Sequence, residues 1–163
     1  MEHKTNFQHV QEFTNAVRLG RGLGPCPDKP SPMTREEVIF IAKMVMSEMA
    51  ELVDTISESS EDTMRIMREC LGADPSKHVK YETEAELISA QADGLIDAKY
   101  YIDDMGSKKG INLDDVFNLV HQANMNKLVD GKAIIRPEDG KVLKPEGWKE
   151  ADIVEFFKTA LNT

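Results

Sequence analysis

The apolar residues of this chain recur at steps of three and four positions along nearly its whole length, and this spacing restricts the fold more than any other feature. Phe7, Val10, Phe13 and Val17 form the first such apolar face. A threonine at position 34 with a glutamate three residues later is a capping box, which marks the start of a second helix. We predict helices over residues 5–19, 34–56, 62–71, 82–105, 112–127 and 151–161.

Glycine and proline divide these helices. Residues 20–32, GRGLGPCPDKPSP, contain three glycines and four prolines, which excludes a helix interior and predicts an extended connector. Gly72 and Pro75 should end the short helix, and Asp139-Gly140 between two short apolar runs predicts a hairpin. We therefore expect an all-α fold in a single domain, residues 1–163. It is a helical bundle of four to five main helices, with a short hairpin-like appendage after the fourth.

The charge balance excludes several classes of partner. Acidic residues outnumber basic residues 29 to 20, which gives a formal net charge of −9. This charge repels phosphate backbones, so we expect binding to neither nucleic acid nor anionic membranes. Apolar runs fall short of the ~20 residues of a membrane span. Cys26 and Cys70 lack a CxxC or Cys/His setting, so we expect reduced thiols in a cytoplasmic protein.

Two pairs of acidic residues differ from the others because they are embedded in apolar sequence. Glu48 and Glu51 stand three apart in the second helix, and Asp93 and Asp97 stand four apart in the fourth predicted helix, so each pair shares a helix face. Carboxylates near a core are costly unless they are paired, protonated or bound to metal. Mg²⁺ prefers such oxygen ligands together with waters and phosphates. The pairs therefore favour a Mg²⁺ site, although boundary carboxylates satisfied by water or lysine would give the same pattern.

The histidines do not support the obvious competing site. A di-iron carboxylate bundle needs Glu-x-x-His pairs, and none occurs here. His3, His9, His78 and His121 are scattered, and we interpret all four as ordinary surface or boundary residues.

Basic residues concentrate after the helix over residues 112–127. Within about twenty residues of an acidic chain, the segment offers five cations, Lys127, Lys132, Arg136, Lys141 and Lys144. Such a segment could be merely solvated, or it could cover a bound polyphosphate. Trp148, the one tryptophan, could stack on a base, but anchoring the tail to the helices is the better-supported role. We expect this basic tail, residues 131–148, to close over a bound nucleotide.

At these residues the chain resembles the all-α nucleoside triphosphate pyrophosphohydrolases, the MazG-like and phosphoribosyl-ATP pyrophosphohydrolase-like superfamily. That family carries an E-E-x-x-E motif, here residues 47–51, and an acidic motif on the next long helix, here D-x-L-x-D at residues 93–97. A branch with this second motif also has a V-H-x-x-N-M-x-K helix end and a D-G-K-V-x-K-P-x-G-W tail. Residues 120–127 and 139–148 match both. The chain departs at Ser47 and Gly94, where the family has glutamates.

The resemblance implies Mg²⁺-dependent hydrolysis of the α–β phosphoanhydride of a nucleoside triphosphate, with Mn²⁺ as a substitute, releasing a monophosphate and pyrophosphate. It also implies a homodimer or a dimer of dimers. Metal ligands would be Glu48, Glu51, Asp93 and Asp97, with Glu48 or Glu51 also orienting the attacking water. The substrate would be held by Asn124, Lys127, Lys141, Lys144 and Trp148.

Two alternatives stay open at the level of sequence. The chain could be a phosphoribosyl-ATP pyrophosphohydrolase, although its long tail resembles the other branch. It could also be a non-catalytic helical module that binds a nucleotide or a protein, because two motif positions depart from the family. The presence of both Asn124 and Lys127 favours an enzyme.

Overall fold

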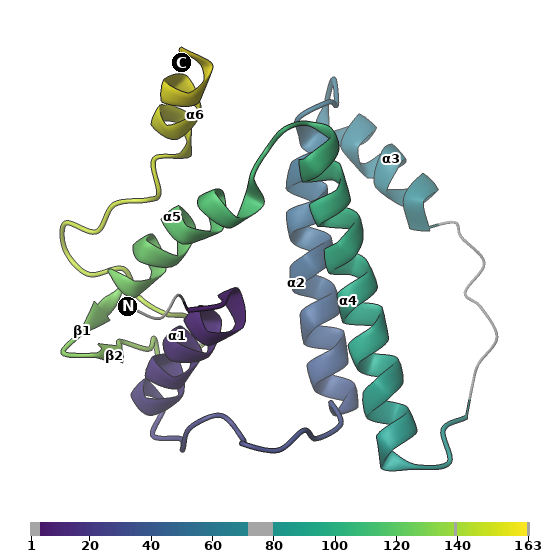
Figure 1. Cartoon of the computed structure of the whole chain (residues 1–163), viewed down its shortest axis with the longest axis vertical. Helices are drawn as coiled ribbons and strands as arrows, with labels where there is room; N and C mark the ends of the chain where they lie inside the picture. The colour runs from purple at the N-terminus through teal and green to yellow at the C-terminus, as the bar shows by residue number, and fades with distance from the viewer. Residues whose placement is uncertain (1–3, 72–79, 139, 163) are drawn as a thin grey trace. The chain divides into compact units, whose positions relative to one another are not determined.

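The computed structural model describes residues 4–71, 80–138 and 140–162, and these residues are mostly helical (Figure 1). The described helices are α1 (Asn6–Gly20), α2 (Arg35–Asp54), α3 (Ser60–Leu71), α4 (Glu84–Lys108), α5 (Leu113–Met125) and α6 (Ile153–Leu161). Two short strands follow α5, namely β1 (Leu128–Val129) and β2 (Lys132–Ala133). The predicted all-α fold with a hairpin after the fourth main helix is therefore confirmed.

The helix starts follow from local capping. Thr34 accepts from the backbone N–H of Glu37, whose side chain accepts in return from the Thr34 N–H, so the predicted capping box is present. Asn112 caps α5 by accepting from the Asp114 N–H. Gly110 follows α4 at a φ of 67°, a conformation that glycine adopts without strain. Gly72 and Pro75 lie outside the described residues.

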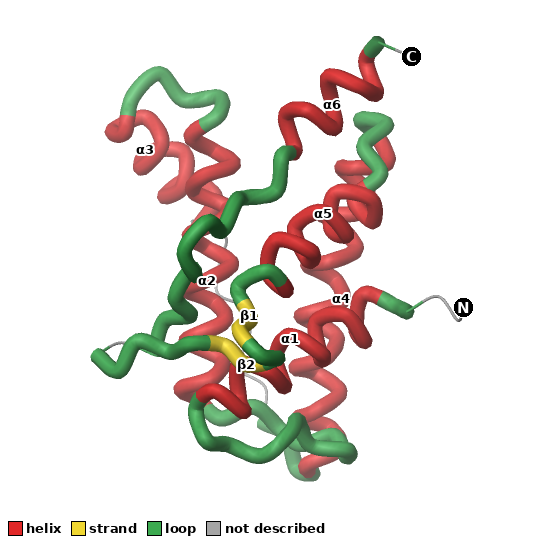
Figure 2. The backbone as a smooth tube through the Cα atoms, turned by 90° about the vertical axis from the view of Figure 1, so that its left-hand side faces the viewer, coloured by secondary structure: helices red, strands yellow, loops and turns green. Residues whose placement is uncertain are grey.

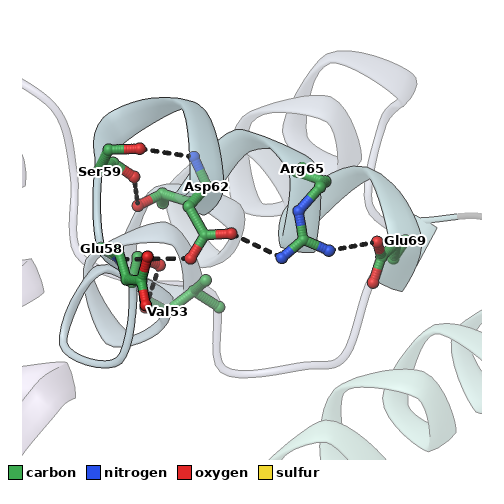
Figure 3. A network of polar contacts seen from close by, with 8 residues as sticks. Val53, Glu58, Ser59, Asp62, Arg65 and Glu69 are labelled. Atoms are coloured by element: carbon green, nitrogen blue, oxygen red, sulfur yellow. Dashed lines mark hydrogen bonds and ion pairs between the residues drawn. The ribbon is translucent and has the colours of Figure 1, made fainter.

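A polar network fixes the start of α3 (Figure 3). Ser59 accepts from the Asp62 N–H, and the Asp62 carboxylate accepts from the Glu58 N–H. The Arg65 guanidinium bridges Asp62 and Glu69 at 2.6 and 2.7 Å, and its hydrogen bond is the largest factor lowering the pKa of Asp62. These contacts are local, so α3 begins where its own sequence satisfies the first free N–H groups.

Backbone contacts divide the chain into two compact units, residues 1–29 with 98–163, and residues 30–97. The division falls within α4. In the second unit, the buried Thr63 of α3 donates to the Asp54 carboxylate at the end of α2 over 2.9 Å. Gln91 of α4 accepts from the Met33 N–H and donates to the Met33 carbonyl, which holds the entry to α2.

Within the first unit, α1 contacts both α5 and β2, and the two strands are yellow in Figure 2. β1 and β2 pair antiparallel around Asp130 and Gly131, both at positive φ. This Asp-Gly turn is a hairpin signal that the sequence interpretation overlooked. The hairpin predicted at Asp139-Gly140 is represented by an antiparallel bridge between Ile135 and Val142. Asp139 itself lies outside the described residues.

Few side chains are buried within the described chain. The buried apolar residues are Ala16, Met67, Ala123 and Ala133, and α2 contains no buried residue. None of the described helices combines the length and apolar character that a membrane span requires.

Close packing of α1 on β2 predicts a stability defect. A Cβ added to Gly20 would lie 2.2 Å from the Ala133 carbonyl oxygen, a backbone atom that cannot rotate away. Gly20→Ala should therefore lower the thermal midpoint, because overpacking of about 1–3 kcal/mol exceeds the helix-propensity gain of about 1 kcal/mol. Gly24→Ala is the matched control, since no atom lies within 4 Å of its added Cβ. Equal midpoints for the two variants would show that α1 and β2 do not pack this way.

Candidate active site

The glutamate pair lies in the second half of α2. Glu48 and Glu51 share a face, and both are exposed in the chain. Neither carboxylate has a hydrogen-bond or ion-pair partner among the described residues. The sequence interpretation placed these groups against an apolar core, whereas the structure leaves them open because α2 buries none of its own residues.

The aspartate pair lies in the part of α4 that belongs to the second unit. Asp93 and Asp97 are likewise exposed and unpaired within the described chain. Asp93 borders an open depression of about 520 Å³ that Lys80 and Tyr81 also line. A cation and an aromatic ring beside the first aspartate are site features that the sequence analysis did not single out.

The two pairs lie at different levels within one chain. In Figure 1, α2 and α4 run in the same direction, and Gln91 is bonded to Met33 at the entry of α2. Glu48 lies roughly 20 Å along α2 from its first residue, Arg35, whereas Asp97 lies only roughly 9 Å along α4 beyond Gln91. Accordingly, no three of the four carboxylates converge within 4.8 Å in the described part of the chain.

The two positions that depart from the family motif have simple local structures. The Ser47 hydroxyl donates to the Met44 carbonyl at 2.8 Å, so it bonds to its own helix. A Cβ on Gly94 would meet nothing within 4 Å, so the absence of a side chain there is not required by packing.

The predicted substrate-binding residues converge in the first unit. Lys127 donates to the Asn124 side-chain oxygen at 2.8 Å, just past the end of α5. The Trp148 indole N–H donates to the Ala123 carbonyl at 2.7 Å. The ammonium groups of Lys127 and Lys144 lie 5.1 and 4.2 Å from the centroid of the Trp148 ring. We call Asn124, Lys127, Lys144 and Trp148 the cationic cluster.

These contacts explain how the tail is positioned. Trp148 fixes the tail to α5 through one hydrogen bond, which agrees with the anchoring interpretation of this residue. Its ring face then attracts both ammonium groups. Lys144 also contacts the exposed Glu150 at 3.2 Å, whereas Lys141 is an exposed residue of the same tail.

The cationic cluster carries an electrostatic cost in the free chain. Burial lowers the pKa of Lys127, and the neighbouring charge of Lys144 lowers it further. A polyanion placed beside both ammonium groups would offset this repulsion. The cluster is therefore suited to bind an anion such as a phosphate.

The structure also brings together two histidines that the sequence interpretation treated as ordinary. His9 of α1 and His121 of α5 have ring centroids 4.5 Å apart, and Glu12 lies beside them. No sequence signal joins these residues, because they come from helices that are distant in the chain. His3 and His78 lie outside the described residues.

Comparison with known proteins identifies the family. Residues 23–124 match the sequence profile described as phosphoribosyl-ATP pyrophosphohydrolase. The chain belongs to this family. The matched profile ends before the basic tail. The whole chain, including the tail, is similar to the crystal structure of a proposed NTP pyrophosphohydrolase from Exiguobacterium sp. 255-15. That match has a TM-score of 0.82 and 26% identity, and it covers 99% of this chain and 97% of the other. Among curated proteins, none matches.

Family membership confirms the resemblance inferred from the acidic motifs and the tail. Both comparisons describe pyrophosphohydrolases, one of phosphoribosyl-ATP and one of nucleoside triphosphates. The family therefore has a nucleotide substrate and a phosphoanhydride bond as its common chemistry.

Proposed function

We propose that this protein is a Mg²⁺-dependent nucleoside triphosphate pyrophosphohydrolase that cleaves the α–β phosphoanhydride. The observation that carries the proposal is the whole-chain structural likeness, which extends through the tail to a protein described as acting on nucleoside triphosphates. The family match over residues 23–124 supports the same reaction type.

The acidic pairs have the donor chemistry that Mg²⁺ requires. Glu48, Glu51, Asp93 and Asp97 offer carboxylate oxygens, and none is occupied by a partner within the described chain. These four residues would hold one or more Mg²⁺ ions, each pair contributing its own carboxylates, and Mn²⁺ could replace Mg²⁺. A bound ion would neutralise phosphate charge and lower the pKa of water.

The chain's own residues supply binding and orientation. Lys127 and Lys144 provide point charges for the phosphate chain, and Asn124 can donate to a phosphate oxygen through its amide. Lys141 adds a further charge from the tail. One glutamate of the α2 pair, Glu48 or Glu51, would accept a hydrogen bond from the attacking water and so orient it. No covalent intermediate is needed for this hydrolysis.

A second candidate substrate is phosphoribosyl-ATP, because the matching family profile carries that description. The reaction would be the same α–β cleavage. The tail favours nucleoside triphosphates, since it lies beyond the matched profile and within the whole-chain structural match.

Metal dependence and product identity test the proposal together. Activity on a panel of ribo- and deoxynucleoside triphosphates and phosphoribosyl-ATP should disappear in EDTA and return with Mg²⁺ or Mn²⁺, because unneutralised carboxylates repel a polyphosphate. Separation of the products should show a monophosphate and pyrophosphate. Release of a diphosphate and orthophosphate would refute α–β cleavage, and tight binding without turnover would favour a non-catalytic binding module.

We infer in addition that the active form is a homodimer or a dimer of dimers. Large apolar side chains are exposed on α2 and α4 within one chain. Phe40 and Leu52 of α2 are 62% and 60% exposed, and Tyr100 and Tyr101 of α4 are 72% and 74% exposed. Apolar faces of this extent are typical of interfaces between copies of one chain.

Light scattering after size exclusion tests this inference. The native protein should elute as a dimer or tetramer, and Phe40→Asp should shift it toward the monomer because a charge would enter the apolar interface. Leu161→Asp is the control, since it adds the same charge to an exposed apolar residue at the end of α6. A native protein that is monomeric at every concentration would contradict the inference.

A further inference from the structure

Three metal-ligating side chains meet where α1 packs against α5. His9 and Glu12 are three residues apart on α1, and His121 projects from α5. Each can offer one ligand atom such that all three atoms lie within 4.8 Å of one another. It is the one such cluster of His, Cys, Asp and Glu among the described residues.

A second observation at this cluster is a polar atom without a partner. His9 Nδ1 is buried and has no hydrogen-bond partner. Among the described residues, it is the one buried side-chain nitrogen or oxygen atom in this situation. His121 is only 5% exposed. Native proteins rarely leave a buried ring nitrogen without a partner, and a bound metal ion would supply one here.

Aromatic packing by itself does not account for this arrangement. Phe117 stacks on His121 at 6.0 Å, and a third aromatic ring in place of His9 would extend that contact without an orphaned nitrogen. The Glu12 carboxylate lies beside both rings, and its Oε2 accepts a hydrogen bond from Lys4 at 2.6 Å. An anionic oxygen is thus held beside two imidazole rings.

We propose that His9, Glu12 and His121 bind Zn²⁺ or a chemically similar transition-metal ion. Two imidazoles and one carboxylate suit Zn²⁺, Co²⁺ or Ni²⁺, whereas Mg²⁺ prefers oxygen ligands. Three protein ligands leave the fourth tetrahedral position for water. Ligand atoms around a tetrahedral Zn²⁺ are about 3.4 Å apart at bond lengths of about 2.1 Å. The exposed Glu12 and the two rings therefore close by small rotations when the ion binds.

The ion would cross-link two helices that carry different parts of the chain. Asn124 lies in the last turn of α5 and Lys127 follows its end, so a metal bond at His121 would fix the helix end that carries them. This role does not depend on the proposed hydrolase activity, because the site uses none of the four acidic-pair residues.

The test uses untagged full-length protein. A chelator first removes bound metal, and the protein is then returned to buffer with millimolar Mg²⁺. Calorimetric titration with ZnCl₂ should show one ion per chain, and Zn²⁺ should raise the thermal midpoint. Titration with Co²⁺ should give the visible absorption of a nitrogen- and oxygen-coordinated ion. Ring-nitrogen resonances of His9 and His121 should shift when Zn²⁺ is added.

Variants separate this site from other carboxylates. Glu12→Gln and His121→Asn should each weaken Zn²⁺ binding at least about tenfold, while Glu61→Gln, an exposed carboxylate of α3, should not change it. Glu12 is exposed, so its variant keeps the test valid if His121→Asn fails to fold. The proposal is overturned if the native chain binds no stoichiometric Zn²⁺, or if Glu12→Gln binds it as tightly as the native chain. Loss of nucleotide hydrolysis would bear only on the proposed function.

Discussion

Glu51→Gln and Asp97→Asn should each lower kcat by at least about a hundredfold, because each removes one charge from the proposed Mg²⁺ ligand set while keeping side-chain volume. Both side chains are exposed in the chain, so the thermal midpoint should change little. Steady-state kinetics with excess Mg²⁺ and a thermal melt of the same preparations measure the two effects.

Controls for this prediction come from the same helices. Glu36→Gln in the first turn of α2 and Glu84→Gln in the first turn of α4 also remove one exposed carboxylate each. These two variants should retain native turnover. If Glu51→Gln or Asp97→Asn turns over as fast as its control, that residue does not bind the metal.

Lys127→Gln and Lys144→Gln should raise KM for the nucleotide by roughly 10- to 100-fold, the value of one charge-assisted contact of about 1.5–3 kcal/mol. Both ammonium groups lie over Trp148, so they are positioned together by the tail. The apparent affinity for Mg²⁺ should change much less, because the carboxylates lie on α2 and α4. Initial rates at varied nucleotide and at varied Mg²⁺ distinguish the two parameters.

Point variants test the tail better than its removal. Truncation after Val129 would also delete the buried Ala133, which packs against α1, so a change in KM could reflect damage to the first unit. Trp148→Phe instead keeps an aromatic ring in the tail while removing the N–H that donates to Ala123 and part of the ring face, and it should raise KM in the same direction. Lys149→Gln, an exposed neighbour, is the control. Unchanged KM in all three variants of the cationic cluster would eliminate the tail as a phosphate-binding element.

The sequence alone determined the features that depend on neighbours within a few residues. The helices were predictable because apolar spacing and caps such as Thr34–Glu37 act within one or two turns. The acidic pairs were recognisable because spacings of three and four place two side chains on one helix face. Only the Asp130-Gly131 hairpin was overlooked among the local elements of the first unit, although its dipeptide is a known turn signal.

Tertiary structure decided what comes together across distant segments. Trp148 could have stacked on a base or anchored the tail, and the hydrogen bond to Ala123 shows the anchor. The acidic pairs were expected against a core, but a chain whose α2 buries no residue leaves them exposed. His9 and His121 had no shared sequence signal and became neighbours only because α1 packs on α5. Periodicity specifies which face of a helix is apolar, but it does not specify which other helix will pack against that face. A site formed by residues of two helices therefore depends on the tertiary packing.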